Sequence, residues 1–249
     1  MARLAFVLAL IFGPSGALAQ AQLRIAVEGA YPPFNYAEGQ EPAGFEVDLG
    51  RALCEAMGLP CTFVLQDWDG LHAALKEKRI DAIMSSMEIT PERRSRYRFS
   101  RPYYRMPSLL IGRRDADIPD PFNTTSLAGK RVGVVEDGEF AAYLESLPAK
   151  PEIRLYHKLD DAELDLLAER LDFVLGDKLE IQSFLQSREG GDCCRPVADL
   201  PVDRGEGYGV AVRKGDRGLA EMFDAAIAKV IADGTYDRIR AKYLPFDIK

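Results

Sequence analysis

The sequence predicts an α/β protein built from two open sheets, each covered by helices. Stretches of strand length, rich in β-branched and apolar residues, alternate with stretches whose apolar residues recur at helical spacing. A loop rich in proline, aspartate, asparagine and threonine at 115–126 interrupts this alternation, which then starts again. About 230 residues follow the N-terminal leader, a length that suits two modest domains. These observations favour two α/β units in succession.

The N-terminus has the pattern of a secretory signal peptide. Arg3 precedes an apolar run at 4–12, and a small-x-small motif, Ala-Leu-Ala, follows at 17–19. The apolar run is about half the length needed to span a bilayer. We expect residues 1–19 to be cleaved on export, with an uncleaved anchor as the alternative, and no later stretch is long enough to cross a membrane.

The first unit has the order strand, helix, strand, helix, strand. Its first helix, expected over 46–58, carries Val47, Leu49, Leu53 and Met57 at near-helical spacing and stops at a glycine. The other elements follow from composition and period: strands at 23–29, 61–68 and 81–86, a helix at 70–79, and an extended segment at 99–114.

The second unit repeats the alternation after the loop, although no sequence repeat accompanies it. Its expected strands lie at 130–138, 152–157 and 172–177, its expected helices at 139–147, 160–171 and 178–189, with a further strand at 207–215 and a final helical run at 218–244.

The composition argues against several classes of function. The chain has 39 acidic and 32 basic residues, a net charge of −7 and no basic patch, so nucleic acid is not an expected partner. His72 and His157 lack metal-ligand spacing, and we expect neither a metal nor a cofactor. Because the sequence has no G-x-S-x-G elbow and no Walker-type loop, we do not expect an enzyme.

Four cysteines follow the export signal. Cys54 and Cys61 flank a helix end and a strand start, and an oxidising compartment favours a disulfide between them. Cys193 and Cys194 are adjacent and could form a vicinal disulfide, stay free or pair with another chain; the sequence leaves these alternatives open.

Ligands of open α/β sheets bind beyond the carboxyl ends of the strands. In the first unit the residues at these ends are Glu28, Tyr31, Trp68, Ser85 and Ser86. Trp68, the only tryptophan, could be a flat wall that attracts a cationic side chain, or a core aromatic. Tyr31, in a loop stiffened by two prolines, could form the opposite wall.

Charged groups near the strand ends could bind the two ends of a ligand. Arg93 lies in a charged turn; its guanidinium could grip a carboxylate through two hydrogen bonds, or simply be solvated. Asp177 could bind an ammonium group or only cap the next helix. The acidic stretch 136–140 opens a helix whose N-terminus could also bind an anion.

Several segments, in the right order, carry a resemblance to a known family: "YPPFNY", "GFEVDLGRALCEAMGLPC", "LKEKRIDAIMSSMEITPERR", "FSRPYY", "LAGKRVGVV" and "DGTYDRIRAKYLPFDI". Together they resemble the periplasmic polar-amino-acid binding proteins of ABC importers, in particular the lysine/arginine/ornithine- and histidine-binding group of the family 3 extracellular solute-binding proteins.

The resemblance implies a two-lobed Venus-flytrap fold that closes on its ligand. Lobe one would comprise 22–107 and 206–249, and lobe two 108–205, joined by two crossing segments. The resemblance also implies a disulfide between Cys54 and Cys61.

The resemblance implies roles for the candidate residues. Arg93 matches the group that grips the α-carboxylate, Ser85 and Ser86 match strand-end groups that meet the amino-acid moiety, and Asp177 matches the acid that holds the α-ammonium.

The ligand side chain has its own matches. Tyr31 and Trp68 match the aromatic walls around it, and Glu28 matches the acid that meets a distal cation. Two positions depart from the family pattern: Glu88 and Glu139, the latter after Gly138 at a helix start, stand where relatives usually have small hydroxyl residues. A carboxylate there would repel a ligand carboxylate.

The resulting hypothesis is a periplasmic protein that captures an amino acid, with lysine, arginine or ornithine as the expected class. It would deliver the ligand to an inner-membrane ABC permease complex, and we expect a monomer. The alternatives are a cyclohexadienyl dehydratase on the same fold, with Glu88 and Glu139 as proton donors, and a ligand-sensing module.

Overall fold

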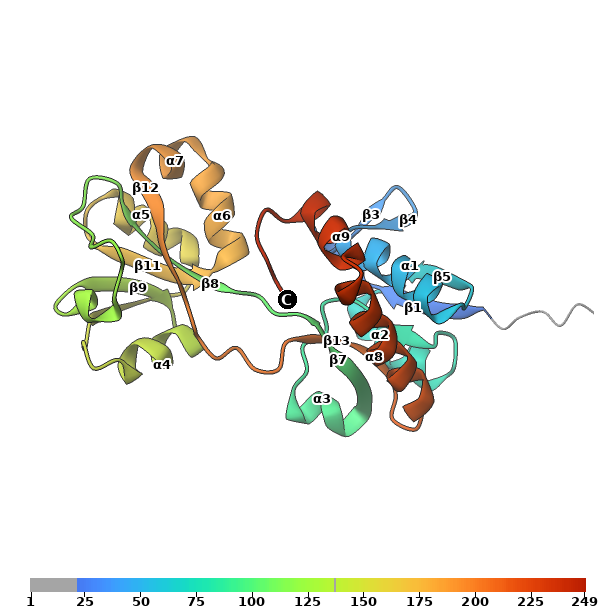
Figure 1. Cartoon of the computed structure of the whole chain (residues 1–249). Coiled ribbons are helices and arrows are strands. Elements are labelled where there is room, and N and C mark those ends of the chain that lie inside the picture. The colour runs from blue at the N-terminus through green and yellow to red at the C-terminus, as the bar shows by residue number, and fades with distance from the viewer. Residues whose placement is uncertain (1–21, 137) are drawn as a thin grey trace, which may run out of the picture.

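The protein has two α/β lobes connected by extended segments. The structure is a computed structural model that describes residues 22–136 and 138–249, and the expected signal peptide at 1–19 lies outside the described residues. Figure 1 shows the two lobes at opposite ends of the molecule, joined by the segments that link β7 to β8 and β12 to β13.

Lobe one is built on a five-stranded sheet of order β5-β1-β6-β13-β7. Strand β1 runs parallel to β5 and β6, whereas β13 runs antiparallel to β6 and β7. The strands are β1 Leu23–Val27, β5 Cys61–Leu65, β6 Ala82–Ile83, β7 Tyr97–Tyr104 and β13 Tyr208–Arg213. A small sheet of β2 Ala30–Tyr31, β3 Asn35–Glu38 and β4 Glu41–Ala43 lies beside it.

Helices cover both faces of the lobe-one sheet. One face packs against α1, α8 and α9, and the other against α2. The bounds are α1 Phe45–Met57, α2 Trp68–Lys76, α8 Arg217–Ala232 and α9 Thr235–Tyr243, with a short α3 at Pro91–Arg96. Successive residues of β1 alternate between the two cores, with Ile25 in one and Ala26 in the other, as the two-residue period of a strand requires.

Helix α1 shows why this sequence is helical. Its buried positions include Val47, Leu49 and Leu53, the spacing expected from the sequence, and it ends at Gly58 with φ 68. The disulfide between Cys54 and Cys61, with Cα atoms 6.1 Å apart, ties this helix end to the start of β5.

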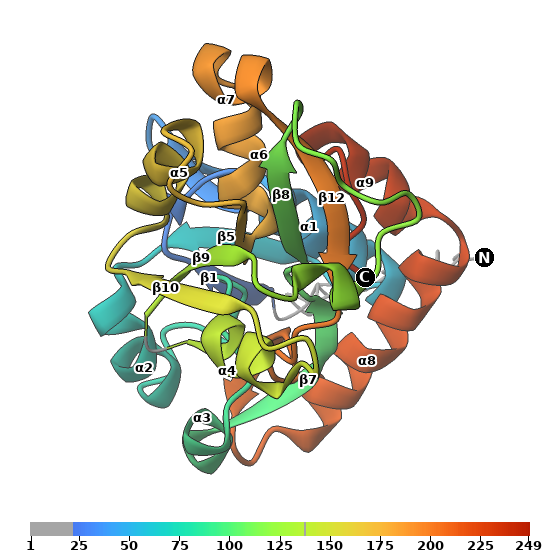
Figure 2. The same cartoon turned by 90° about the vertical axis from the view of Figure 1, so that its left-hand side faces the viewer.

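Lobe two is built on a second five-stranded sheet, of order β10-β9-β11-β8-β12. Figure 2 views this lobe from its outer side, with the antiparallel strands β8 and β12 next to each other. The strands are β8 Ser108–Arg113, β9 Arg131–Val135, β10 Glu152–Tyr156, β11 Phe173–Asp177 and β12 Cys194–Leu200. The helices are a 3-10 turn, η1, at Thr124–Leu127, α4 Glu139–Ser146, α5 Leu159–Leu167, α6 Lys178–Gln186 and α7 Arg188–Cys193.

The structure corrects several expected elements. The extended segment at 99–114 is two strands, β7 and β8, that belong to different sheets. The final helical run breaks into α8 and α9 at Gly234, whose φ of 76 only glycine adopts readily. The helix expected at 178–189 ends before Ser187, which caps α7 instead.

Two further differences concern strands. Trp68 begins α2 rather than ending β5, because Asp67 caps the helix by accepting a hydrogen bond from the amide of Gly70. Strand β12 has no counterpart among the expected elements, since its alternation contains a proline and two charged residues.

The C-terminal segment adds a third link between the lobes. The amide of Arg105, in the β7–β8 connection, donates to the carbonyl of Ile248 over 2.7 Å. The Lys178 ammonium of lobe two lies 5.3 Å from the ring centre of Phe246. The C-terminal segment therefore contacts both the β7–β8 connection and the start of α6 in lobe two.

Cys193 and Cys194, whose pairing the sequence leaves open, form a vicinal disulfide between α7 and β12. No helix in the described part of the chain has the length and apolar character needed to cross a membrane.

Candidate functional site

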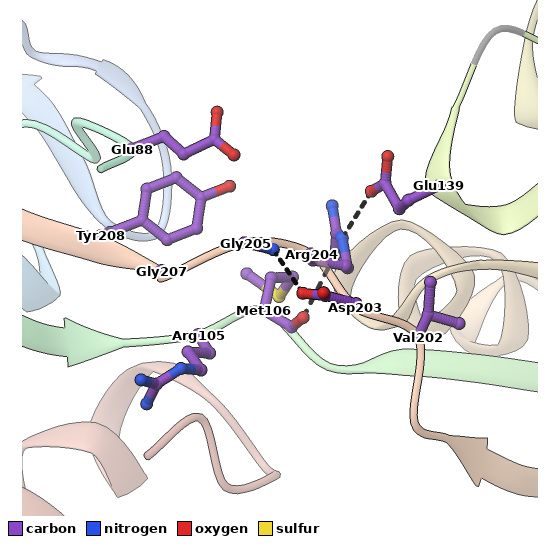
Figure 3. Close-up of a pocket in the computed structure, with 10 residues that line it drawn as sticks. All are labelled: Glu88, Arg105, Met106, Glu139, Val202, Asp203, Arg204, Gly205, Gly207 and Tyr208. Atoms are coloured by element: carbon purple, nitrogen blue, oxygen red, sulfur yellow. Dashed lines mark hydrogen bonds and ion pairs between the residues drawn. The ribbon is translucent and has the colours of Figure 1, made fainter. Parts of the chain in front are cut away.

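Two adjoining cavities lie where the lobes meet, and Tyr208 lines both of them. The smaller, about 380 Å³, is a lobe-one site lined by Glu28, Ala30, Tyr31, Trp68, Ser85 and Ser86. The larger, about 620 Å³, lies between Glu88 of lobe one and Glu139 of lobe two, with Arg204 beside them (Figure 3). We call them the inner cavity and the hinge cavity.

The inner cavity collects five of the residues singled out from the sequence, because β1, β5 and β6 end at the same edge of the sheet. Tyr31 and Trp68 are partly open to solvent, with 42% and 37% of their surface exposed, which is unusual for aromatic residues of this size. They provide apolar walls, whereas Glu28 and the serines provide polar groups.

A buried carboxylate, Glu46, positions the serine turn. Its Oε1 accepts hydrogen bonds from the amide of Ser86, over 2.6 Å, and from the hydroxyl of Tyr103, and its Oε2 accepts from Nδ2 of Asn35 over 2.6 Å. Burial raises the pKa of Glu46, and these hydrogen bonds oppose that shift. The network holds Ser86 at φ 46, a left-handed conformation rare for serine.

Ser85 and Asn35 extend this network to the strand-end loop of β1. The Ser85 hydroxyl oxygen accepts a hydrogen bond from the amide of Glu28 over 2.9 Å, and Asn35 Oδ1 accepts one from the amide of Gly29 over 2.8 Å. Both serines therefore belong to a rigid polar support. The Ser86 hydroxyl itself is buried and has no hydrogen-bond partner among the described residues.

A column of stacked aromatic rings runs from the inner cavity to the hinge. Tyr31 stacks on Phe34, Phe34 on Tyr104, and Tyr104 on Tyr208, with centroid separations of 5.4, 4.7 and 4.3 Å. Burial and the negative charge of Asp177 raise the pKa of Tyr31 to about 12. The Tyr31 hydroxyl is thus neutral at physiological pH, and the negative charge of Asp177, in the opposite lobe, acts on it electrostatically.

Arg93 lies in the short helix α3, next to Trp68. Its amide donates a hydrogen bond to the hydroxyl oxygen of Thr90, which caps α3. Its Nη1 donates to the carbonyl of Glu88 over 3.1 Å, and its guanidinium lies 5.6 Å from the centre of the Trp68 ring. Arg93 is not one of the residues that line the two cavities in the described part of the chain. The structure therefore brings Arg93 next to Trp68 but not into contact with the inner cavity.

Asp177 has two hydrogen-bonding tasks at the start of α6. Its Oδ1 accepts from the amide of Leu179 over 2.8 Å, which is the helix cap considered from the sequence. Its Oδ2 accepts from Nη1 of Arg204, also over 2.8 Å. The carboxylate expected to hold a ligand ammonium is thus already paired with a cation of the protein.

The same arginine pairs with Glu139, the first residue of α4 after the N-cap Gly138. Arg204 Nε donates to Glu139 Oε1 over 2.8 Å, and Arg204 Nη1 also reaches the carbonyl of Met106 over 3.2 Å. Figure 3 shows Arg204 directed toward Glu139, with Glu88 on the opposite wall. Glu139 is therefore part of an ion pair instead of a bare carboxylate.

Sequence reasoning missed Arg204 and Tyr208. Both lie in or directly after the irregular segment between β12 and β13, which carries no strand or helix pattern. The available signal was the segment "VDRGEGY" itself, a charged, glycine-rich connection between two strands of different lobes. Connections of this kind often carry functional groups.

Comparison with known proteins supports a family assignment. The chain is 41% identical over 233 residues to the L-arginine-binding protein of Pseudomonas aeruginosa, which covers 91% of this chain and 89% of that protein. It is 34% identical over 232 residues to the lysine/arginine/ornithine-binding periplasmic protein of Escherichia coli K12, covering 91% and 88%.

Solved structures agree on the fold. The L-cystine solute receptor of Neisseria gonorrhoeae, in its unliganded open conformation, aligns with a TM-score of 0.77 at 24% identity over 92% of this chain and 95% of that one. The family model of the bacterial extracellular solute-binding proteins, family 3, matches residues 23–246. The chain therefore belongs to the bacterial extracellular solute-binding proteins of family 3.

Proposed function

We propose that the protein captures a basic amino acid, arginine or a close relative such as lysine or ornithine, between its two lobes. The observation that carries this proposal is the inner cavity, in which a carboxylate, Glu28, lies with the exposed aromatic walls Tyr31 and Trp68. A cationic side chain gains both ion pairing and cation–π attraction in such a pocket. The 41% identity to a protein named for L-arginine binding supports the same ligand class.

The amino-acid end of the ligand would meet the polar support. The Ser86 hydroxyl would bond the ligand, and Asp177 would hold the α-ammonium through Oδ2, whose second lone pair remains after the bond from Arg204. Arg93 would bind the α-carboxylate only after its guanidinium moves from the Trp68 face toward the cavity.

Binding would close the lobes. Glu28, Tyr31 and Trp68 belong to elements of lobe one, whereas Asp177 and Glu139 belong to lobe two, so only a closed molecule brings all of them onto one ligand. Ligand contacts on both lobes stabilise the closed state because the open state offers only half of them. The hinge would lie in the β7–β8 and β12–β13 connections.

We further propose that the protein acts in the periplasm after cleavage of its signal peptide, as a monomer, and delivers its ligand to an ABC permease complex. Family membership supports this role. Delivery is the reason for a two-lobed clamp: a partner that recognises the closed form distinguishes loaded from empty protein.

We propose no catalytic activity. The dehydratase alternative needs Glu88 or Glu139 as a proton donor, and Glu139 is already engaged in an ion pair with Arg204. Incubation with prephenate or arogenate should leave the absorbance of these compounds unchanged. Conversion by the wild-type protein at rates above a heat-inactivated control would contradict this proposal.

The ligand class is tested by a thermal-shift screen of the common amino acids and amines, followed by calorimetry. We expect arginine, lysine or ornithine to raise the melting temperature, because a ligand that binds only the folded state stabilises it. The same screen on Glu28→Gln should show a smaller shift with these three ligands. A wild-type protein that responds to none of them would rule out the basic-amino-acid assignment.

A further inference from the structure

Arg204 is a cation of the protein that lies inside the proposed ligand cleft. Its side chain is only 21% exposed, and it makes charge-assisted hydrogen bonds to Glu139 and Asp177 together with the bond to the Met106 carbonyl. Its guanidinium also lies 5.2 Å from the ring centre of Phe140. Four partners, from α4, the start of α6 and the β7–β8 connection, hold the guanidinium in one place.

The carboxylates around the hinge cavity explain why a cation is needed. Glu88 and Glu139 face each other across the cavity (Figure 3), and Asp177 of lobe two forms an ion pair with Arg204. An α-amino acid carries its own carboxylate, which three negative side chains would repel. A carboxylate-free amine of the same side chain would be attracted by all three.

Arg204 reduces the net negative charge that the lobe-two wall presents to a ligand. Its pairing with Glu139 cancels one negative charge, and its bond to Asp177 leaves that carboxylate one lone pair on Oδ2. The lobe-two wall then carries one net negative charge, which matches a single α-ammonium and tolerates a neighbouring α-carboxylate. Without Arg204 the same wall would carry two.

We propose that Arg204 determines the ligand class of the cleft: by neutralising Glu139 it makes the site accept α-amino acids and discriminate against the corresponding decarboxylated amines. This inference rests on the proposed function, because it concerns the same cleft and the same basic side chains. It also gives one of the two departures from the family pattern, Glu139, a physical role as the partner of Arg204.

The test compares arginine with agmatine, which keeps the guanidinium and lacks the carboxylate. Calorimetry of the wild type should show tighter binding of arginine. In Arg204→Gln, arginine should bind about tenfold more weakly while agmatine binds at least as tightly as before, since removal of a cation favours the ligand of higher positive charge. Lysine against cadaverine provides a second pair.

Charge compensation separates neutralisation from a purely structural role. In Glu139→Gln, the freed guanidinium should tighten arginine binding a few-fold, and the double variant Arg204→Gln/Glu139→Gln should recover most of the arginine affinity lost in Arg204→Gln. Failure of the double variant to recover it, or equal weakening of arginine and agmatine in Arg204→Gln, would overturn the inference.

Arg94→Gln is the matched control. Arg94 is an exposed arginine that pairs with Glu206 of the same connecting segment, so the substitution removes an equal charge near the hinge but outside both cavities. Its ratio of arginine to agmatine affinity should equal that of the wild type.

The wild-type and variant results answer different questions. A wild type that binds no basic amino acid contradicts the proposed function. A wild type that binds arginine, combined with an Arg204→Gln variant that keeps the wild-type preference for arginine over agmatine, contradicts only the inference about Arg204.

Discussion

Asp177 illustrates how one residue serves both the fold and the site. One carboxylate oxygen caps α6, and the other accepts a hydrogen bond from Arg204, which lines the hinge cavity. A substitution at this position therefore has two effects that can be separated, because asparagine caps helices as well as aspartate does and alanine does not.

We predict that Asp177→Asn and Asp177→Ala both weaken arginine binding by about 2–5 kcal/mol, the scale for losing one partner of a buried charge pair. Only Asp177→Ala should also lower the free energy of unfolding, by about 1 kcal/mol for the lost cap. Calorimetry and urea denaturation measure the two quantities. Near wild-type affinity in both variants would remove Asp177 from the site.

A second single-residue substitution, at Arg93, tests the binding of the ligand carboxylate. Arg93→Ala should weaken arginine binding by about 2–5 kcal/mol, because the ligand carboxylate loses its proposed partner and Trp68 loses the guanidinium on its face. Calorimetry with Arg94→Ala as the control should show little change, since Arg94 is exposed and pairs away from the inner cavity. Equal effects of the two substitutions would contradict this role.

Glu163 provides a pH-dependent prediction that does not involve the ligand. This buried residue of α5 has its pKa raised to about 7 by burial and by the charges of Asp160 and Glu180. Between about pH 4.5 and pH 7 the folded protein keeps a proton that the unfolded chain has lost, so the free energy of unfolding falls as the pH rises through this window.

Glu163→Gln should remove that part of the pH dependence. The variant should be more stable than the wild type by up to about 3 kcal/mol at pH 8 and nearly equal to it at pH 4, as measured by denaturant titration. Glu145→Gln, an exposed position on α4, is the control and should show no such trend. A constant offset between Glu163→Gln and the wild type at all pH values would disprove the assignment.

At the scale of elements, the connection between β12 and β13 is sterically constrained at Gly207. Gly207 has φ +97, and a Cβ at this position would lie 2.6 Å from the carbonyl oxygen of Tyr104. The backbones of the two connections are in close contact here, and only glycine allows that approach together with this conformation.

We therefore predict that Gly207→Ala lowers the free energy of unfolding by about 1–3 kcal/mol through left-handed strain and the clash with Tyr104. Gly215→Ala, after β13, should be nearly neutral, because a Cβ there meets no atom within 4 Å. Urea denaturation of both variants checks this. Equal stability of the two would mean that the hinge backbone can adjust without cost.

For the whole molecule, the division of the site between the lobes predicts a change of shape. Saturating arginine should reduce the radius of gyration measured by small-angle scattering, because the ligand stabilises the closed form. Asp177→Asn at a ligand concentration that saturates the wild type should remain more extended, since its lobe-two contact is weakened. An unchanged radius of gyration in the wild type at saturation would contradict closure.

The local pattern of the sequence predicted many of the helices and strands and several residues of the inner cavity. Helix α1 has the spacing and glycine stop that predict it, and the strands β1, β5 and β6 that deliver Glu28, Ser85 and Ser86 follow from composition and period. These features depend on neighbours in the chain, which is why a single sequence shows them. The family resemblance added the two-lobed fold.

Tertiary structure alone decided the relation between distant residues. The segment 99–114 divides between two sheets, Glu46 supports Ser86 from 40 positions away, and Arg204 meets Glu139 across 65 positions. No local pattern encodes such pairs, because charge and hydrogen-bond partners are chosen by the packing of the lobes. The sequence by itself determined the class of fold and five of the residues that line the inner cavity, and the fold decided that Tyr208 joins them and that Glu139 pairs with an arginine of the hinge.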